Sequence, residues 1–393
     1  MNTKIFAIPY NGDPCLIASL NSTTVREVYG RPTMIGIGGG RASLSLPHEI
    51  SRENIEKAVK LSHQNNIKFH YVANSPLIVE DAMTTENKNR VIEEIRWAKY
   101  MGVDAIIVST HFLSTLVARM DMSFIVSKLA RVKTVEDIIL WSNRGASQIC
   151  LDLNVIRNLD LLARMQDHTG QCNLQLLVND ACLFKCPYDN LHSHYSSMAS
   201  QPGVKYTHYY SFKCLGEHFL EKPQEILRAT YIRPEDLHHY ESLGFDNFKL
   251  VDRNRSTDWI LNVLLAYTNR KYDGNLAEIL SLFSALGRAD NSQMQTFSDV
   301  TIDRIGELRK SLPAIMDVFI DNKKLQGVFE NMQRINCETQ VCDVTCNFCK
   351  RTAQEIISIN GKIRTHQLMD NVFSILNTSQ PCNAEVVENP INY

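Results

Sequence analysis

The chain has 393 residues, 44% of them hydrophobic and 21% charged, which excludes a disordered or fibrous protein and allows one large buried core. Its 41 Lys and Arg residues nearly balance its 43 Asp and Glu residues, so no overall basic field marks a polyanion partner. The opening stretch MNTKIFAIPYNGDP lacks the apolar core of a signal peptide, and no apolar run is long enough for a membrane helix. We therefore expect a cytoplasmic protein.

Short apolar runs rich in β-forming residues alternate with helical patterns from the start of the chain. The predicted strands cover residues 4–10, 33–39, 67–74, 103–110, 123–128, 147–153, 173–179 and 246–252. Helical patterns lie between them, such as the one that Ser51 would cap and the one that would end at Gly102. Eight strands alternating with helices predict an α/β fold, a parallel (β/α)8 barrel of the TIM type, with a doubly wound open sheet as the alternative.

The regular alternation breaks between the seventh and eighth predicted strands. Residues 180–244 are too many for a simple connection and carry several cysteines, so we expect an insertion that shapes an active site. After the last barrel helix, a mostly helical extension carries a four-cysteine motif. The sequence thus predicts a barrel over residues 1–272, including the insertion, and a C-terminal extension over residues 273–393.

Polar residues stand where the predicted strands end, which is the face of a barrel that holds the chemistry. Any one of them is also typical of a helix cap, but as a set they mark the barrel mouth. Lys249 and Arg253 fall on the same face of the last strand by its period of two. The residues predicted to bind a polar or anionic substrate are His70, Asn74, His111, Asp152, Asn179, Lys249 and Arg253.

The stretch CETQVCDVTCNFCK contains Cys342-x3-Cys346-x2-Cys349, the spacing of a radical S-adenosylmethionine cluster loop. That reading is disfavoured because the predicted barrel lies before the motif, and because Cys337 supplies a potential fourth thiolate. Four thiolates suit a closed [4Fe-4S] cluster or a tetrahedral Zn²⁺ ion. We expect metal ligation here, with iron–sulfur ahead of zinc.

A second set of cysteines, Cys182, Cys186 and Cys214, begins just beyond the seventh predicted strand. Pro187 follows Cys186, as in the Cys-Pro pairs found at iron–sulfur ligands. Isolated buried thiols are the alternative. A cluster with these three local ligands could recruit a lone cysteine elsewhere, and the sequence does not identify the fourth ligand.

The arrangement resembles peptidase family U32, the collagenase-like peptidases. The resemblance covers about the first 270 residues, in GRASLSLPHEISRENIEKAVKLSHQNNIKFHYVAN, SKLARVKTVEDIILWSNRGASQICLDLNV, LQLLVNDACLFKC and IRPEDLHHYESLGFDNFKLVDR. The family's strand Lys-Ile-Glu-Gly-Arg corresponds here to Lys249-Leu250-Val251-Asp252-Arg253, so the Lys and Arg match while the Glu and Gly do not. The cysteine loop also departs, with Asn179 and Asp180 where the family commonly has His-Gly.

The resemblance implies an enzyme, because the members understood in mechanism are oxygen-independent hydroxylases with a [4Fe-4S] cluster in a barrel. Our leading hypothesis is therefore a redox modification of a small molecule, a peptide or an RNA base. It involves one or two [4Fe-4S] clusters, with zinc as the alternative at the C-terminal quartet. We expect an electron donor, and a homo- or hetero-oligomer is compatible with the sequence. Two alternatives remain. One is a U32-type peptidase, for which no catalytic pair can be assigned, and the other is a non-catalytic scaffold or partner protein whose fold is stabilised by bound metal.

Overall fold

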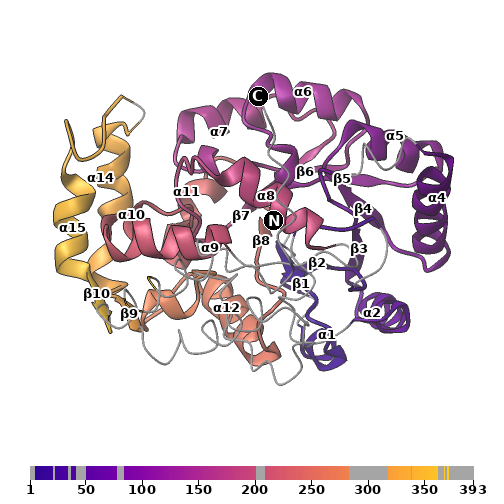
Figure 1. The fold of residues 1–393 in the computed structure, drawn as a ribbon, viewed down its shortest axis with the longest axis horizontal. Helices are drawn as coiled ribbons and strands as arrows, with labels where there is room; N and C mark the ends of the chain where they lie inside the picture. Colours follow the sequence, from indigo (N-terminus) through magenta and orange to yellow (C-terminus); the bar gives the residue numbers. More distant parts are fainter. Residues whose placement is uncertain are drawn as a thin grey trace, which may run out of the picture.

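The structure, a computed structural model, describes residues 5–20, 23–33, 37–40, 50–77, 84–200, 209–282, 317–337 and 339–361, with residues 367 and 370. Eight parallel strands form a closed barrel in chain order, and β1 closes it by pairing with β8 (Figure 1). The strands are β1 Phe6–Pro9, β2 Val25–Gly30, β3 Lys68–Val72, β4 Ala105–Val108, β5 Phe124–Val126, β6 Gln148–Cys150, β7 Asn173–Leu177 and β8 Phe248–Lys249. The (β/α)8 prediction is confirmed.

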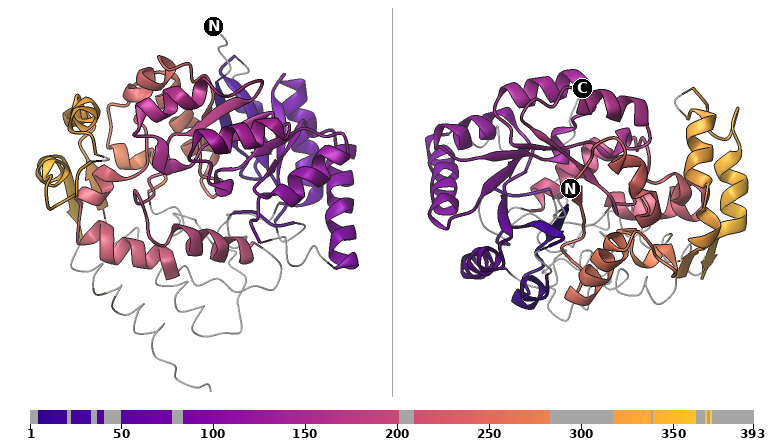
Figure 2. Two further views of the ribbon diagram at one scale, coloured as in Figure 1. Left: turned by 90° about the horizontal axis from the view of Figure 1, so that it is seen from above. Right: turned by 180° about the vertical axis from the view of Figure 1, so that it is seen from behind.

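Helices follow the strands and cover the outside of the barrel (Figures 1 and 2). They are α1 Pro14–Ser19, α2 Arg52–Gln64, α4 Thr85–Tyr100, α5 His111–Arg119, α6 Val135–Asn143, α7 Leu159–Gln166, α11 Leu237–Glu241 and α12 Thr257–Thr268. Ser51 caps α2 as predicted, in a reciprocal capping box with Asn54. The α4 helix ends just before Gly102, whose φ of +77° is a left-handed conformation that glycine adopts without strain.

The prediction of a strand over residues 33–39 is wrong where the structure describes it. Thr33 and residues 37–40 are not in a strand, and residues 34–36 lie outside the described residues. The second strand is β2, eight residues earlier than predicted. Its Glu27 is buried inside the barrel, so the strand lacks the continuous apolar run by which parallel strands are recognised.

The segment between β7 and β8 folds as a helical insertion. It contains α8 Asp189–Met198, α9 Tyr209–Lys213, α10 Gln224–Arg228 and α11, and a π-helix over Cys214–Leu220 continues directly from α9. Residues 201–208 lie outside the described residues.

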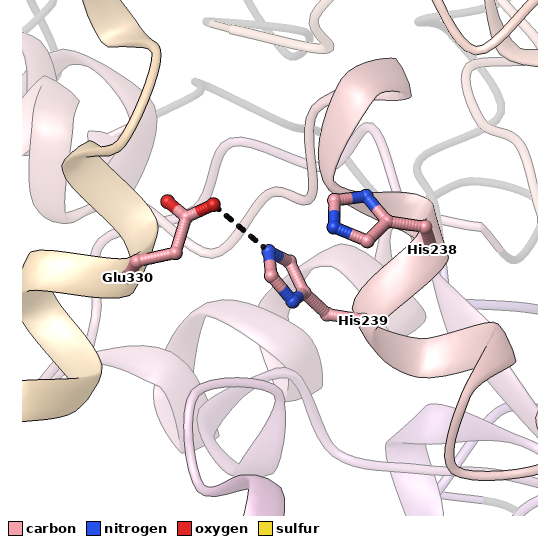
Figure 3. Close-up of side chains that lie close together, drawn as sticks. All are labelled: His238, His239 and Glu330. Carbon is pink, nitrogen blue, oxygen red and sulfur yellow. Dashed lines mark ion pairs between the residues drawn. The ribbon is translucent and has the colours of Figure 1, made fainter.

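The C-terminal part contains α14 Val328–Ile335 and α15 Phe348–Ile356, together with β9 Asp317–Ile320 and β10 Ile357–Asn360. The two strands pair antiparallel, which adds a small sheet to the extension predicted as mostly helical. In Figures 1 and 2 this part lies beside α10, outside the barrel. An ion pair of 3.3 Å between His239 of α11 and Glu330 of α14 also joins it to the barrel (Figure 3).

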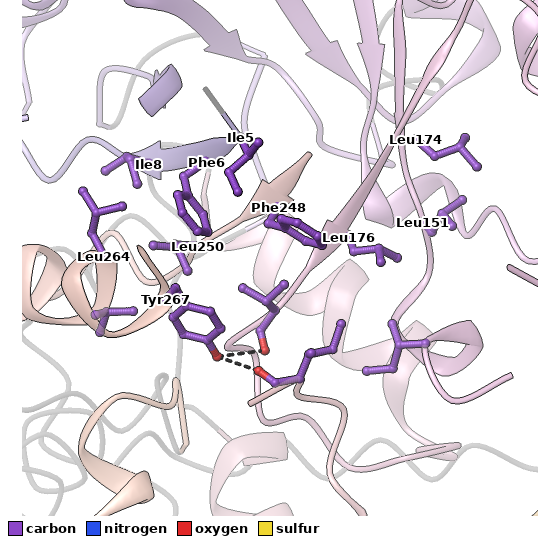
Figure 4. Close-up of a cluster of buried hydrophobic side chains, with 14 of the residues drawn as sticks. Ile5, Phe6, Ile8, Leu151, Leu174, Leu176, Phe248, Leu250, Leu264 and Tyr267 are labelled. Carbon is purple, nitrogen blue, oxygen red and sulfur yellow. Dashed lines mark hydrogen bonds between the residues drawn. The ribbon is translucent and has the colours of Figure 1, made fainter. Parts of the chain in front are cut away.

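The main apolar core lies between the strands and the surrounding helices. Phe6 and Phe248, on the two strands that close the barrel, pack with ring centroids 6.3 Å apart (Figure 4). The Tyr267 hydroxyl donates to the carbonyl oxygen of Ile232 at 2.7 Å, so α12 is tied to the end of the insertion. Within the described residues, no helix is long and apolar enough to cross a membrane.

Candidate active site in the barrel mouth

A pocket of about 100 Å³ opens at the C-terminal ends of the strands. Apolar side chains from three strands, β3, β4 and β7, form part of its wall, and its polar lining converges from several strand ends. The polar and ionisable lining residues are Tyr29, Asn74, Ser127, Lys128, Cys150, Asp180, Lys249 and Arg253. An open pocket with a few convergent polar groups at this face is the arrangement of a barrel active site.

Lys249 supplies an amine in the pocket that is almost withdrawn from water. Its Nζ lies 3.9 Å from the centroid of the Tyr29 ring, and its side chain is 8% exposed. Burial lowers the pKa of Lys249, and the nearby Cys150 and Glu27 only partly oppose this. Arg253 lines the same pocket, so the last strand places both basic groups of the KLVDR segment at one site.

Lys128, directly after β5, adds a third basic group. Its Nζ lies 3.5 Å from a carboxylate oxygen of Asp180. Burial alone would lower the pKa of Lys128, but the negative charges of Asp180 and neighbouring groups raise it well above its usual value. Lys128 therefore carries its charge at neutral pH, beside both the pocket and Cys182.

A glycine loop forms one edge of the pocket. The Gly40 N–H donates to the Asn74 Oδ1 at 3.0 Å, and the Asn74 Nδ2 donates to the Ser127 Oγ at 2.8 Å. A Cβ at position 40 would lie 2.3 Å from the Leu129 Cδ1, so a side chain there forces Leu129 to move. The loop thus packs against the Leu129 side chain of the 3₁₀ turn Lys128–Ala130 without room for a Cβ unless Leu129 moves.

A buried polar network lies inside the barrel. Glu27 accepts hydrogen bonds from the side-chain amides of Gln148 at 3.1 Å and Gln175 at 3.0 Å, and lies 3.4 Å from the His70 Nδ1. Asn247 completes the network through both glutamines. Burial alone would raise the pKa of Glu27, but His70, the Gln148 hydrogen bond and Lys249 lower it to about 2. The charged carboxylate couples this network to Lys249.

Cys182, Cys186 and Cys214 are free thiols that come together from the loop after β7 and from the π-helix. Each is partly buried. Burial raises the pKa of Cys182 to about 12, and burial together with the other two thiols raises the pKa of Cys214 beyond that. Cys182 also packs against Cys150, Leu177 and Val251, which line the mouth pocket.

The surroundings of these thiols suit a bound metal cluster. Burial raises the pKa of Cys186, and the backbone N–H groups of Tyr188 and Asp189 and the charge of Arg131 partly oppose this. The positive charge of Lys128 likewise favours the thiolate form of Cys182, against the larger effect of burial. Sulfur ligands, N–H donors to sulfur and nearby cations are the features that stabilise an iron–sulfur cluster.

The C-terminal cysteines lie in the connection from α14 to α15, and Cys349 lies in α15 itself. The backbones of Cys342 and Cys346 form a bridge, and Asp343 between them receives both guanidinium nitrogens of Arg228 at 2.7 and 3.0 Å. Burial raises the pKa of Cys349, and the nearby positive charges of Arg157 and Arg228 partly oppose this. The fourth cysteine, Cys337, is close enough to Cys349 to raise its pKa, after the larger effect of burial. The motif therefore sits against α10, which follows the π-helix of Cys214.

The structure brings three of the predicted substrate residues to the mouth pocket, namely Asn74, Lys249 and Arg253. Asp152 lines a smaller neighbouring pocket, together with Cys182 and Lys128. The two pockets share Lys128 and Leu129, so these four residues belong to one region.

The other three predicted residues lie elsewhere. His70 belongs to the buried network inside the barrel. Asn179 is fully buried. Its Oδ1 accepts a hydrogen bond from the Val251 N–H at 2.8 Å, and its Nδ2 donates to the Val251 carbonyl oxygen. His111 stacks on Trp141 of α6 at 4.2 Å, outside the barrel.

Sequence reasoning did not assign five residues of the region to the site: Glu27, Tyr29, Ser127, Lys128 and Cys150. Glu27 and Tyr29 lie on β2, the strand that was misplaced. Ser127 and Lys128 come just after the end of β5, which is the signal that could have identified them.

The family model for peptidase family U32 matches residues 34–269. The barrel and its inserted cysteines thus define a U32-type barrel protein, and the chain belongs to peptidase family U32. It is 29% identical over 339 residues to a protein of Methanocaldococcus jannaschii named as an uncharacterized protease, covering 85% of this chain and 89% of that one. A solved structure, the U32 peptidase Mk0906, is similar with a TM-score of 0.49 and 17% identity, over 64% of this chain and 93% of that one.

Proposed function

We propose that the chain is an iron–sulfur enzyme that carries out a redox modification in the barrel mouth, namely hydroxylation that uses no dioxygen. The observation that carries the proposal is the gathering of Cys182, Cys186 and Cys214 beside the mouth pocket. When bound, a cluster would supply one-electron redox chemistry next to the substrate.

The three thiols fit such a group by their donor chemistry. As buried neighbours they hold their protons when no metal is present, because thiolates would repel one another there. An iron–sulfur core is cationic and would replace those protons, so cluster binding should release them. Lys128 would stay charged and favour the thiolate form of Cys182.

The basic groups of the pocket define the substrate class. Lys249, Arg253 and Lys128 face one small pocket that also holds Asn74 and Asp180. Together they would orient an anionic or polar small molecule, or the reacting end of a peptide. Burial excludes most water from Lys249, which strengthens its interaction with a substrate oxygen.

The C-terminal quartet is proposed as a second metal site, either iron–sulfur or zinc. Its attachment to α10 through Arg228 places it along the chain segment that follows Cys214. A cluster here would fit an electron-relay role between a redox partner and the mouth, and zinc would fit a structural role.

Metal content and visible absorption after anaerobic purification would test the proposal. The variants are Cys182→Ala/Cys186→Ala and Cys346→Ala/Cys349→Ala, with Cys15→Ala as a control because Cys15 is exposed and outside both sets. We expect about four irons per cluster and a broad visible band, reduced in the first variant and unchanged in the control. Zinc alone without a visible band would contradict the redox proposal.

The names of the relatives favour a second function, peptide hydrolysis. A peptidase would keep cleaving peptides in the Cys182→Ala/Cys186→Ala variant, whereas a cluster-dependent enzyme would lose its activity. Iron that persists in that variant but disappears with Cys346 and Cys349 would move the redox chemistry to the C-terminal quartet.

A further inference from the structure

Three side chains with metal-binding atoms converge where the barrel meets the C-terminal part. His238 and His239 come from α11, and Glu330 comes from α14 (Figure 3). Each offers one ligand atom, and these atoms all lie within 4.8 Å of one another. Consecutive residues of a helix normally diverge by about 100°, yet the two imidazole rings lie 3.9 Å apart.

His238 is held in the tautomer that binds metals. Its Nδ1 lies 2.8 Å from the carbonyl oxygen of Glu235. A carbonyl oxygen can only accept, so the Nδ1 carries the hydrogen, and the Nε2 of the neutral ring keeps its lone pair free. Metal-binding histidines are typically oriented by such a bond from the other ring nitrogen to a carbonyl or carboxylate.

His239 and Glu330 already have the separation of two ligands on one ion. The distance from the His239 Nε2 to the Glu330 Oε1 is 3.3 Å. Two ligands at the bond lengths of tetrahedral zinc lie about 3.3 Å apart. Among the described residues, the buried Oε2 of Glu330 has no hydrogen-bond partner, so the carboxylate has an unused acceptor at this contact.

The charges around the three residues permit a cation. Arg233 is near enough to help lower the pKa of Glu330, for which burial is the larger and opposing effect. Its guanidinium, however, is held by Asp236 in a two-point bond of 2.7 and 2.8 Å, which balances its charge. The Phe329 ring lies 5.0 Å from His239 and shields one side of the contact.

We propose that His238, His239 and Glu330 bind a divalent transition-metal ion of the zinc type. Two imidazoles and one carboxylate are ligands that zinc accepts, and water would complete the tetrahedron. The ion would join α11 to α14 and so fix the helix that leads into the C-terminal cysteines. This site is separate from both cysteine sets, and the proposal does not depend on the iron–sulfur chemistry.

Titration of the full chain with Zn²⁺ and Co²⁺ would test the site. The double variant His239→Gln/Glu330→Gln removes two ligands, and His238→Gln removes an exposed ligand that takes no part in the ion pair. His63→Gln is the matched control, since His63 pairs with Asp104 at 2.9 Å and no third ligand group joins them among the residues that the structure describes. Cys346→Ala/Cys349→Ala separates this ion from one bound by thiolates.

We expect one equivalent of zinc that is retained in the control and the cysteine variant. The Kd for zinc should rise at least about tenfold in His238→Gln and in His239→Gln/Glu330→Gln. Cobalt at this site should show ligand-field bands without thiolate charge-transfer absorption. At the same zinc concentration, zinc should raise the melting temperature of the wild type more than that of His238→Gln. Unchanged stoichiometry and affinity in His238→Gln, with its fold intact by circular dichroism, would overturn the proposal and leave an ordinary ion pair.

Discussion

Replacing Glu27 with Gln would remove one charge from the centre of the buried network while keeping the size of the side chain. Glu27 is 2% exposed and is hydrogen-bonded by Gln148 and Gln175. Burial alone would raise its pKa, but His70 and its other partners lower it to about 2 from 4.5. The charged form of the carboxylate therefore stabilises the folded barrel.

The expected loss follows from that pKa. A fall from 4.5 to about 2 corresponds to about 3 kcal/mol of unfolding free energy at pH 7, at about 1.4 kcal/mol per tenfold change. Breaking a buried ion pair costs a similar amount. Because the folded-state pKa is the lower one, this stabilisation is complete above about pH 4.5 and is lost as the pH falls towards 2. At pH 3, less than half of this stabilisation, roughly 1 kcal/mol, should remain.

Urea unfolding of the wild type and Glu27→Gln at pH 7 and pH 3 would measure both values. Glu56→Gln is the control, because Glu56 pairs with Lys60 on the exposed face of α2 at 2.9 Å. Its loss should stay below about 0.5 kcal/mol. A loss below about 1 kcal/mol for Glu27→Gln at pH 7, or an equal loss at both pH values, would refute the reasoning.

Three further predictions concern the pocket and its attachment. Lys249→Met should raise the urea midpoint of unfolding at pH 7, because burial lowers the pKa of Lys249 and its charged form therefore destabilises the fold. The difference in midpoint between variant and wild type should narrow as the pH rises towards 10.5, and a lower midpoint in the variant would contradict this. Gly40→Ala should cost about 1–3 kcal/mol of unfolding free energy because its Cβ meets Leu129. Adding Leu129→Ala should recover part of that loss of unfolding free energy. If it recovers none, the contact with Leu129 is not the cause of the destabilisation. Arg228→Lys should cost about 1–2 kcal/mol by losing the two-point bond to Asp343, and an unchanged melting curve would show that this bond does not stabilise the fold.

Most of the barrel could be predicted from the sequence because seven of its strands are apolar runs between helix patterns. The exception is β2, where Arg26 and Glu27 interrupt the apolar residues. Glu27 is inside only because Gln148, Gln175 and His70 from other strands satisfy it. Such long-range compensation leaves no local pattern. The TMIGIGG stretch, in contrast, has a strand-like composition, yet its described residues, Thr33 and 37–39, are not in a strand.

The sequence predicted where the candidate site lies, but not which side chains line it. Strand ends correctly indicated Asn74, Lys249 and Arg253 as neighbours of one pocket. Whether a strand-end side chain faces the pocket depends on the backbone beyond the strand, which spacing does not determine. Asn179 turns back to bond the backbone of Val251, while Asp180 beside it lines the pocket.

The two-residue strand β8 has a consequence for how the protein is made. It closes the barrel by pairing with β1: Phe248 lies opposite Phe6, and Lys249 lies opposite Ala7. Ribosomes add about 5–20 residues per second, so about 12–50 s pass between the synthesis of β1 and that of its last partner. During this time one edge of β1 has no strand beside it and is open to wrong pairing. The pocket acquires the buried amine of Lys249 only in the step that ends this exposure, so the closing of the barrel and the completion of the proposed site are one event.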